Sequence, residues 1–374
     1  MEPGKAGVLR IELIDREQAK TAFLEAAGFS HAERRPLPGD ASTRHYERLH
    51  LPSGQTLMLM DAPPAAESPV CDPAWSPIER AAAGWNAMAR LAAGRIDAFA
   101  ATAAYLRSRG LSAPEILALD IPLGLAVIED FGDGVFARLI EDGADEAELY
   151  FSAIDAQARL HAETPPHMLT ADGASWPLLP YDAFALKAGA DLFVEWQPKL
   201  NPGLVFGAAA RAEWDALWTA IAERGEAGAA VFAHRDFHAE NLLWLPQRKG
   251  YARVGLIDFQ DAVLAHPSWD LHSLLQDARR DVSPELERAA LDRYFAQRPS
   301  VDREAFMADY AALAALNETR ILGVFARLIH RDGKPRYRQF MPRMWGQLER
   351  NLHNPALAGL KVWFDRHVPL EARQ

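Results

Sequence analysis

Cysteine is almost absent from this chain of 374 residues, and because Cys71 stands alone, no disulfide can form within the chain. Long hydrophobic runs are also missing: uncharged stretches such as LNPGLVFGAAA fall well short of the roughly 20 residues that a helix needs to cross a bilayer. The N-terminal segment MEPGKAGVLRIELIDREQ lacks the apolar core of a signal peptide. We therefore expect a cytoplasmic protein with no membrane partner.

Clusters of basic residues are scarce as well. The chain has 40 Lys and Arg against 51 Asp and Glu, a formal net charge of −11, and its basic residues are scattered. Because nucleic-acid binding depends on grouped Lys and Arg that neutralise phosphates, we expect no nucleic-acid partner. The 49% hydrophobic and 24% charged residues are typical of a globular protein, and the length predicts two lobes or two domains.

The first third of the sequence predicts a small mixed lobe. DREQAKTAFLEAAGF has helical spacing and ends at Gly28, and residues 77–109 predict one or two Ala-rich helices. HYERLHLPSGQTLMLMDAPP predicts two strands around a turn at 52–54, and PEILALDIPLGLAVIEDFGDG predicts two more around 122–124. Because Gly132 and Gly134 disfavour continuation of the last strand, we divide the chain into lobes at 1–131 and 132–374.

From residue 145 onward the pattern is mostly helical. Periodic apolar positions occur in DEAELYFSAIDAQARLHAE, YDAFALKAGADLFVEW, RAEWDALWTAIAERG and DYAALAALNETRILGVFARLIH. The exception is a pair of short apolar strands near 242–258. The sequence thus predicts an α+β protein with a small antiparallel sheet lobe and a larger, mainly helical lobe.

The polar stretch FAHRDFHAENLLWL, residues 232–245, is the strongest chemical signal. Asp236 is followed five residues later by Asn241, and a second strand in ARVGLIDFQDA ends at Asp258, 17 residues beyond Asn241. A hairpin turning at PQRKG would bring Asn241 and Asp258 together at one end. Amide and carboxylate oxygens suit Mg²⁺, and Asp236 could accept a proton from a hydroxyl group, which is the division of roles that phosphoryl transfer needs.

This stretch has two other interpretations. Polar residues before a strand are often a solvated turn, although the joint pattern HxDxxxxN, apolar strand and LIDF favours the catalytic interpretation. His234, Asp236 and His238 are spaced by two and could bind zinc, but the chain has neither cysteine ligands nor an HExxH helix. We expect both histidines to brace the loop.

These residues resemble a known family. HRDFHAENLL and LIDFQD are similar to the catalytic and metal-binding loops of the aminoglycoside phosphotransferase and choline kinase superfamily, which has the two-lobed protein-kinase fold. The resemblance implies ATP as phosphoryl donor, Asp236 as catalytic base, and Asn241 and Asp258 as Mg²⁺ ligands.

Further blocks are similar to one branch, the bacterial anomeric kinases that phosphorylate N-acetylmuramic acid and N-acetylglucosamine at the C1 hydroxyl in peptidoglycan recycling. This similarity runs from about residue 36 to 368 through GDASTRHYERL, LMDAPP, IEDFGDG, DFQDAVLAHPSWDLHSLLQDAR and ILGVFARLIHRDGKPRY. It implies a small amino sugar as substrate. A kinase for another small-molecule hydroxyl, such as an aminoglycoside, is the alternative.

One departure from the family concerns the lysine that such kinases usually carry in the third strand. The corresponding segment TLMLMDAPP has none: Met60 stands about where the lysine would be, and Asp61 has the wrong charge. Either another cation contacts the phosphates or the protein is a nucleotide-sensing pseudokinase. PGDASTRHYER places Ser42, Thr43 and Arg44 where a phosphate-covering loop is expected, and we expect Arg44 to replace the lysine rather than to be a plain surface charge.

The remaining expectations concern adenine and the sugar. VIEDFGDG would form the hinge between the lobes, where Glu129 and Phe131 are candidate nucleotide contacts by position; a role of the glycines in ending the strand is compatible with this. Asp261 is a candidate to bind sugar hydroxyls or to order the metal loop. The basic segment RLIHRDGKPRYR, 327–338, would suit the lactyl carboxylate of N-acetylmuramic acid, or is a solvated helix end.

Overall fold

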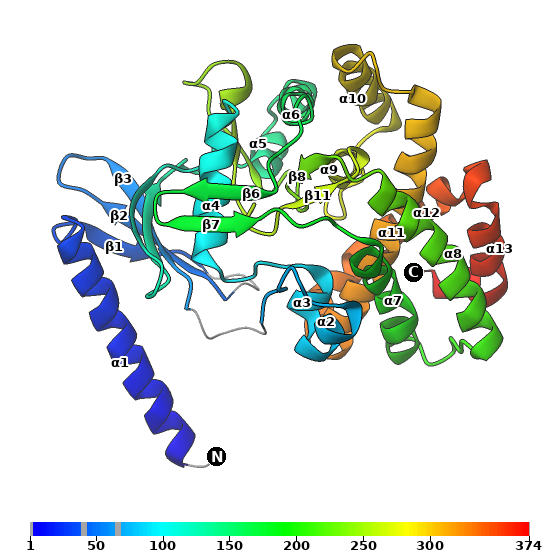
Figure 1. Ribbon diagram of the computed structural model, residues 1–374, viewed down its shortest axis with the longest axis horizontal. Coiled ribbons are helices and arrows are strands. Elements are labelled where there is room, and N and C mark those ends of the chain that lie inside the picture. The colour runs from blue at the N-terminus through cyan, green and yellow to red at the C-terminus, as the bar shows by residue number, and fades with distance from the viewer. Residues whose placement is uncertain (1–2, 39–42, 64–68, 374) are drawn as a thin grey trace.

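The computed structural model describes residues 3–38, 43–63 and 69–373 (Figure 1). Its first part is an antiparallel sheet in the order β1-β2-β3-β5-β4, with a long helix, α1 (Pro3–Ala26), leading into it. The strands are β1 (Glu33–Pro36), β2 (His45–His50), β3 (Thr56–Asp61), β4 (Ile116–Asp120) and β5 (Leu125–Glu129). Both hairpins predicted from the sequence are confirmed, and their turns contain Gly54 and Gly124 in left-handed conformation, with φ of 87° and 66°.

The two faces of this sheet follow from the period-two alternation along its strands. Leu57 and Leu59 of β3 pack with Phe23 of α1 in a small core on the outer face. Met60 belongs to the large core on the other face, and it is fully buried. Successive side chains of a strand point to opposite faces, so Asp61 lies on the side of α1.

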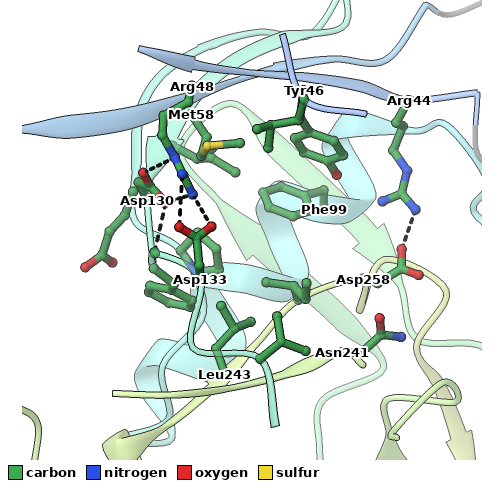
Figure 2. Close-up of a pocket in the computed structure, with 18 of the residues that line it drawn as sticks. Arg44, Tyr46, Arg48, Met58, Phe99, Asp130, Asp133, Asn241, Leu243 and Asp258 are labelled. Carbon is green, nitrogen blue, oxygen red and sulfur yellow. Dashed lines mark hydrogen bonds and ion pairs between the residues drawn. The ribbon is translucent and has the colours of Figure 1, made fainter. Parts of the chain in front are cut away.

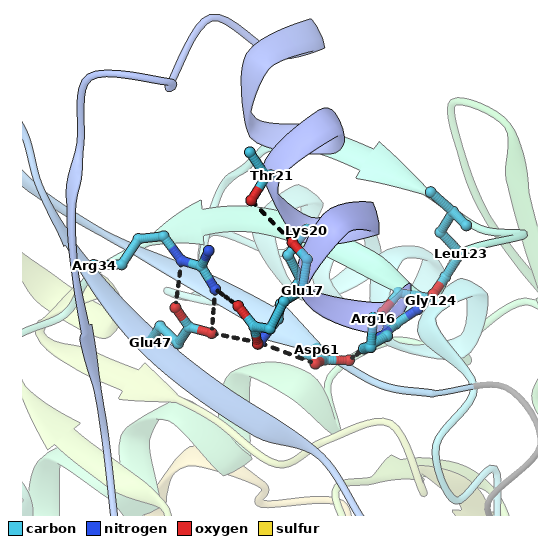
Figure 3. A network of polar contacts seen from close by, with 9 residues as sticks. All are labelled: Arg16, Glu17, Lys20, Thr21, Arg34, Glu47, Asp61, Leu123 and Gly124. Atoms are coloured by element: carbon cyan, nitrogen blue, oxygen red, sulfur yellow. Dashed lines mark hydrogen bonds and ion pairs between the residues drawn. The ribbon is translucent and has the colours of Figure 1, made fainter. Parts of the chain in front are cut away.

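Ion pairs hold α1 on the outer face (Figure 3). Arg16 Nη2 lies 2.6 Å from Asp61 Oδ1, and Lys20 Nζ lies 2.7 Å from Glu47 Oε1 of β2. The predicted helix was too short at its start: the helix begins at Pro3 instead of near residue 15. Proline is well tolerated in the first turn of a helix, because its missing N–H has no partner there in any case.

Residues 77–108 form three helices and not the one or two that were predicted: α2 (Pro77–Ala83), α3 (Trp85–Ala89) and α4 (Ile96–Ser108). The chain breaks at Gly84, with φ of 108°, and again where Arg90 and Ala93 take left-handed φ values of 56° and 53°. Helix α4 is covered by the hairpin of β6 (Met168–Ala171) and β7 (Ala174–Pro177), which packs along it (Figure 1).

The rest of the chain is mainly helical, as predicted, with α11 and α7 packed side by side at its centre. Its helices are α5 (Phe136–Glu141), α6 (Glu146–Leu160), α7 (Ala183–Leu200), α8 (Ala208–Ala227), α9 (Ser268–Leu275), α10 (Pro284–Gln297), α11 (Arg303–His330), α12 (Met341–Leu352) and α13 (Ala358–His367). Short 3-10 turns occupy Gly250–Arg253, Pro335–Phe340, Pro355–Leu357 and Leu370–Ala372. Within the described ranges, none of the helices has the length and apolar character to cross a membrane.

Two short two-stranded sheets interrupt these helices. Strand β8 (Val231–Ala233) pairs with β11 (Val263–Ala265), and β9 (Leu242–Trp244) pairs with β10 (Val254–Leu256), all antiparallel. One large core runs from the inner face of the sheet through α4 and these strands to α10 and α11. The segments 234–241 and 257–262 therefore lie on a rigid base.

Candidate active site

The β9–β10 hairpin brings Asn241 and Asp258 together, as the spacing predicted. Leu242 pairs with Leu256 in register, and the backbone N–H of Ile257 donates to the carbonyl oxygen of Asn241 at 3.2 Å. Asn241 and Asp258 line the same end of one cavity (Figure 2). Asp258 has a left-handed φ of 62°, a conformation that Asp adopts more readily than most residues and that functional sites often contain.

The loop that carries Asp236 is held from beneath by a buried acid that the sequence interpretation missed. Asp270 of α9 accepts the backbone N–H groups of His234 and Arg235 at 2.7 and 2.9 Å. The His234 ring also lies 2.8 Å from the carbonyl oxygen of Ile257, so the ring nitrogen donates to it. An acid within the apolar segment PSWDLHSLL was the available signal, because a buried carboxylate must find donors.

The charges of Asp236 and Asp258 both act on a third carboxylate, Asp261. Burial raises the pKa of the Asp261 carboxyl, and the charges of Asp236 and Asp258 act in the same direction, against the opposing effect of Arg235. Asp236 is half-buried. The candidate base and the candidate metal ligand thus both lie within electrostatic reach of Asp261.

Arg44 lies at the same end of the cavity and contacts the candidate metal ligand directly. Its guanidinium forms an ion pair with Asp258 and donates to Gln260 Oε1 at 2.6 Å, while Gln260 Nε2 donates to Asp258 Oδ1 at 3.0 Å (Figure 2). Burial alone would raise the pKa of Asp258, but the charge and hydrogen bonds of Arg44 bring it below its usual value. Gln260 is a second residue that sequence reasoning missed.

The cavity has a volume of about 320 Å³ and lies between the inner face of the sheet and the β9–β10 hairpin. Its apolar walls could hold a flat aromatic ring, and they include Met58, Phe99, Pro114, Ile128, Val135, Leu243 and Ile257. Glu129, Phe131 and Arg44 line it, while Thr43 is not among the lining residues. Ser42, the other expected loop contact, lies outside the described residues.

The hinge is fastened to the hairpin by Arg248. This side chain pairs with the Glu129 carboxylate, donates to Ser112 Oγ at 2.6 Å and lies 5.1 Å from the ring centroid of Phe131. The backbone N–H of Glu129 donates to the carbonyl oxygen of Glu115 at 2.8 Å. The side chain of Glu129 is thus engaged by Arg248, which leaves the backbone of Glu129 as the candidate nucleotide contact.

A second arginine in the cavity was not anticipated. Arg48 of β2 points to the inner face, where its Nε lies 2.8 Å from Asp130 Oδ2 and its Nη2 2.8 Å from Asp133 Oδ1 (Figure 2). The hydrogen bond from Arg48 lowers the pKa of Asp133. The alternation in HYERLH, which places Arg48 on the same face as Tyr46, was the signal that could have found it.

Apolar packing stands at the position where the family's strand lysine is expected. Met60 is fully buried among apolar side chains, and Phe99 of α4 stacks on Phe259, the residue after Asp258, with ring centroids 4.8 Å apart. Where kinases of this fold form a charged pair between the third strand and this helix, the chain has apolar packing. Asp61 takes no part in the cavity, since it pairs with α1 on the opposite face.

Asp261 orders backbone at the edge of the site. Its Oδ1 accepts the N–H groups of Ala92 and Ala93 at 2.6 and 3.0 Å, and Arg235 Nη1 donates to the carbonyl oxygen of Arg90 at 3.2 Å. The left-handed segment between α3 and α4 is thereby fixed above the catalytic loop. The contacts of Asp261 fit the ordering of backbone, and the backbone they order is this segment and not the metal loop.

The basic segment 327–338 spans the last turn of α11 and the residues that follow it. Arg331 pairs with Asp332, while the half-buried Arg327 lies 5.6 Å from the ring centroid of Trp85 in α3. In the described part of the chain, no three His, Cys, Asp or Glu side chains gather as a metal-binding group, so the zinc interpretation gains no support.

Comparison with known proteins connects this geometry to a family. Residues 33–316 match the family described as "Phosphotransferase enzyme family". An N-acetylmuramate/N-acetylglucosamine kinase from Caulobacter vibrioides is 60% identical over 360 residues, which are 96% of this chain and 99% of that protein.

Solved structures show the same fold at low identity. A choline/ethanolamine kinase family protein from Mesorhizobium loti has a TM-score of 0.54 and 16% identity, with 94% of this chain and 98% of that chain covered. The gentamicin complex of APH(2")-IIa has a TM-score of 0.51 and 13% identity, with 92% and 97% covered. The protein-kinase-like fold expected from the resemblance is confirmed, and the chain belongs to the phosphotransferase enzyme family.

Proposed function

We propose that this protein is an ATP- and Mg²⁺-dependent kinase that phosphorylates the anomeric hydroxyl of N-acetylmuramic acid, N-acetylglucosamine or both, in cytoplasmic peptidoglycan recycling. The observation that carries the proposal is that Asn241 and Asp258 line one end of a single cavity, while the Asn241 amide bonds the backbone carbonyl of Asp236 in the same loop. The name of the Caulobacter relative, at 60% identity over nearly the whole chain, supports the choice of sugar.

Asn241 and Asp258 fit a magnesium ion. The Nδ2 group of Asn241 donates to the carbonyl oxygen of Asp236 at 2.9 Å, which leaves Oδ1 as the edge turned toward Asp258 (Figure 2). A neutral amide oxygen and one carboxylate are a typical protein contribution to a Mg²⁺ site that phosphates and water complete. When bound, the ion would neutralise charge between the β- and γ-phosphates.

Asp236 would act as the base. The anomeric oxygen attacks the γ-phosphorus, the bond from that phosphorus to the β,γ-bridging oxygen breaks, and the hydroxyl proton passes to the Asp236 carboxylate. ADP leaves with the electron pair of the broken bond. Because an anomeric hydroxyl is more acidic than an ordinary alcohol, a carboxylate with no special environment is an adequate base.

In this proposal residues 1–131 form the nucleotide-binding lobe and residues 132–374 form the catalytic and sugar-binding lobe. Adenine would lie between the apolar walls beside Glu129 and Phe131, with the phosphates directed toward Asp258. Arg44, together with Thr43 and Ser42 of its loop, would contact the phosphates in place of the strand lysine. Asp261 would shape the sugar side of the site by fixing the backbone at 92–93.

Two alternatives have specific motives. The gentamicin-bound structural relative motivates an aminoglycoside acceptor, although its 13% identity supports the fold alone. The buried Met60 motivates a nucleotide-sensing pseudokinase, but Arg44 offers a cation at the metal end of the cavity.

An acceptor panel separates these functions. The wild-type protein with ATP and Mg²⁺ should convert N-acetylmuramic acid or N-acetylglucosamine to a sugar 1-phosphate, and leave kanamycin and choline unchanged. Asp236→Asn should abolish turnover and keep nucleotide affinity. Asp142→Asn, at an exposed position, is the matched control. Full activity of Asp236→Asn, or transfer to none of the four acceptors, would refute the proposal.

A further inference from the structure

His238 contacts the candidate metal ligand Asn241. Its Nε2 lies 3.3 Å from Asn241 Nδ2 and 3.3 Å from Arg279 Nη1. An amide –NH₂ group and a guanidinium can only donate hydrogen bonds. The Nε2 atom must therefore be the unprotonated acceptor of the ring, and the ring proton resides on Nδ1.

This acceptor completes the hydrogen bonding of the Asn241 amide. One N–H of Nδ2 goes to the carbonyl oxygen of Asp236 at 2.9 Å and the other is directed to His238. With both N–H groups used on one side, the amide oxygen is turned to the opposite side, toward Asp258 (Figure 2). A rotated amide would present –NH₂ to the metal position, where a cation repels it.

The ring itself is held by a chain of charged groups. Arg279 Nε lies 2.9 Å from Glu240 Oε2, and the backbone N–H of Arg279 donates to Asp277 Oδ1 at 2.8 Å. Glu240 thus holds the guanidinium beside the ring, Asp277 holds the backbone of Arg279, and the ring keeps its nitrogen facing Asn241. His238 lies within the catalytic loop, between Asp236 and Asn241, so its orientation is tied to both.

We infer that His238 is a positioning residue for magnesium: its Nε2 selects the amide rotamer in which Asn241 Oδ1 faces the ion. The inference rests on the proposed function, in which Asn241 is a Mg²⁺ ligand. It predicts that loss of the acceptor weakens the metal step and leaves sugar binding unchanged. Partners that orient metal ligands typically change metal affinity by about 10- to 100-fold when they are removed.

Three variants separate orientation from mere packing. His238→Phe keeps a ring but has no acceptor, and His238→Asn keeps a polar group at the reach of Nδ1, too short for Asn241. His238→Gln places an acceptor oxygen at about the reach of Nε2. The Phe and Asn variants should each raise the Mg²⁺ concentration for half-maximal rate by roughly tenfold or more, and Gln should restore most of the loss.

The decisive measurement is Mn²⁺ binding to the protein with ADP, followed by electron paramagnetic resonance, beside the KM values for Mg²⁺ and sugar. In an Asn241→Ala background, His238→Asn should have no further effect on metal affinity, because the two residues act as one unit. Equal metal affinity in wild type and His238→Asn, or an equal rise in the sugar KM, would overturn the inference. Absence of both sugar phosphorylation and Mn²⁺ binding in the wild type would instead refute the proposed function.

Discussion

Replacement of Arg44 by Ala should change metal binding and nucleotide binding in opposite directions. In the structure, Arg44 forms an ion pair with Asp258, so its positive charge competes with a metal ion for this carboxylate. Binding of Mg²⁺ with ATP must therefore displace the guanidinium from Asp258, and the γ- and β-phosphates are the new anions within its reach. Arg44→Ala removes a competitor of the metal and a partner of the nucleotide at once.

The expected magnitudes follow from the contacts. A hydrogen bond to a charged group contributes about 1.5–3 kcal/mol, so loss of the phosphate contact should weaken ATP binding roughly 10- to 150-fold. The side chains of the Arg44 and Asp258 pair are 10% and 38% exposed, so the ion pair itself is partly screened. Its removal should strengthen binding of Mn²⁺ alone by ~1 kcal/mol, or about fivefold.

The assay is a pair of titrations on the same protein preparations. Isothermal titration calorimetry gives the Kd of ATP with saturating Mg²⁺, and electron paramagnetic resonance gives the Kd of Mn²⁺ without nucleotide. Arg35→Ala is the matched control, because Arg35 is an exposed arginine of β1 whose contact is with Glu33.

Two outcomes would refute this reasoning. If Arg44→Ala leaves both dissociation constants as in the Arg35→Ala control, Arg44 is a surface charge and the phosphates are bound by other groups. If both affinities fall together, the side chain holds the loop in shape and does not exchange between Asp258 and phosphate.

Three further predictions test the surroundings of the site. Met60→Lys should not restore the usual phosphate contact, because it leaves an unpaired charge in the core. It should lower the free energy of unfolding, measured by urea titration, by about 3–5 kcal/mol, and wild-type stability would contradict this. Arg248→Met should raise the KM for ATP about fivefold and leave the sugar KM unchanged, because it frees Glu129 of the hinge from the hairpin. The fivefold change corresponds to ~1 kcal/mol, the contribution of one hydrogen bond. Burial lowers the pKa of His161 and His272 to about 3, so between pH 3 and 6.5 the folded state binds fewer protons than the unfolded state. The free energy of unfolding should therefore fall as pH falls through that window. His272→Phe should reduce the dependence of this free energy on pH by up to about 1.4 kcal/mol per pH unit, and an unchanged dependence in denaturant titrations would disprove the assignment.

Local spacing was enough to predict the parts of the site that one hairpin brings together. Asn241 and Asp258 are joined by two short strands and a turn, so their proximity depends on local geometry alone. The hairpins of the sheet were predictable for the same reason, because each turn contains a glycine between two apolar runs.

Contacts between distant segments could not be predicted in this way. Arg48 meets Asp133 across 85 residues, and Asp270 meets the backbone of His234 across 36, so only the folded arrangement reveals these partners. The break at Arg90 was missed because no propensity rule predicts an arginine in left-handed conformation. A contact distant in sequence stabilises it: Arg235 Nη1 donates to the carbonyl oxygen of Arg90.

The stacked rings of Phe99 and Phe259 have a consequence for control of the enzyme. Many kinases of this fold are switched off when the helix beside the sheet swings away and a charged pair breaks. Here the same movement of α4 would pull two buried phenylalanines from the core and separate α4 from the β6–β7 hairpin, and exposure of each ring costs about 1.5–3 kcal/mol. A swung-out form would then make up less than about 1% of the molecules at rest. We expect a constitutively assembled catalyst whose output follows the supply of its substrates.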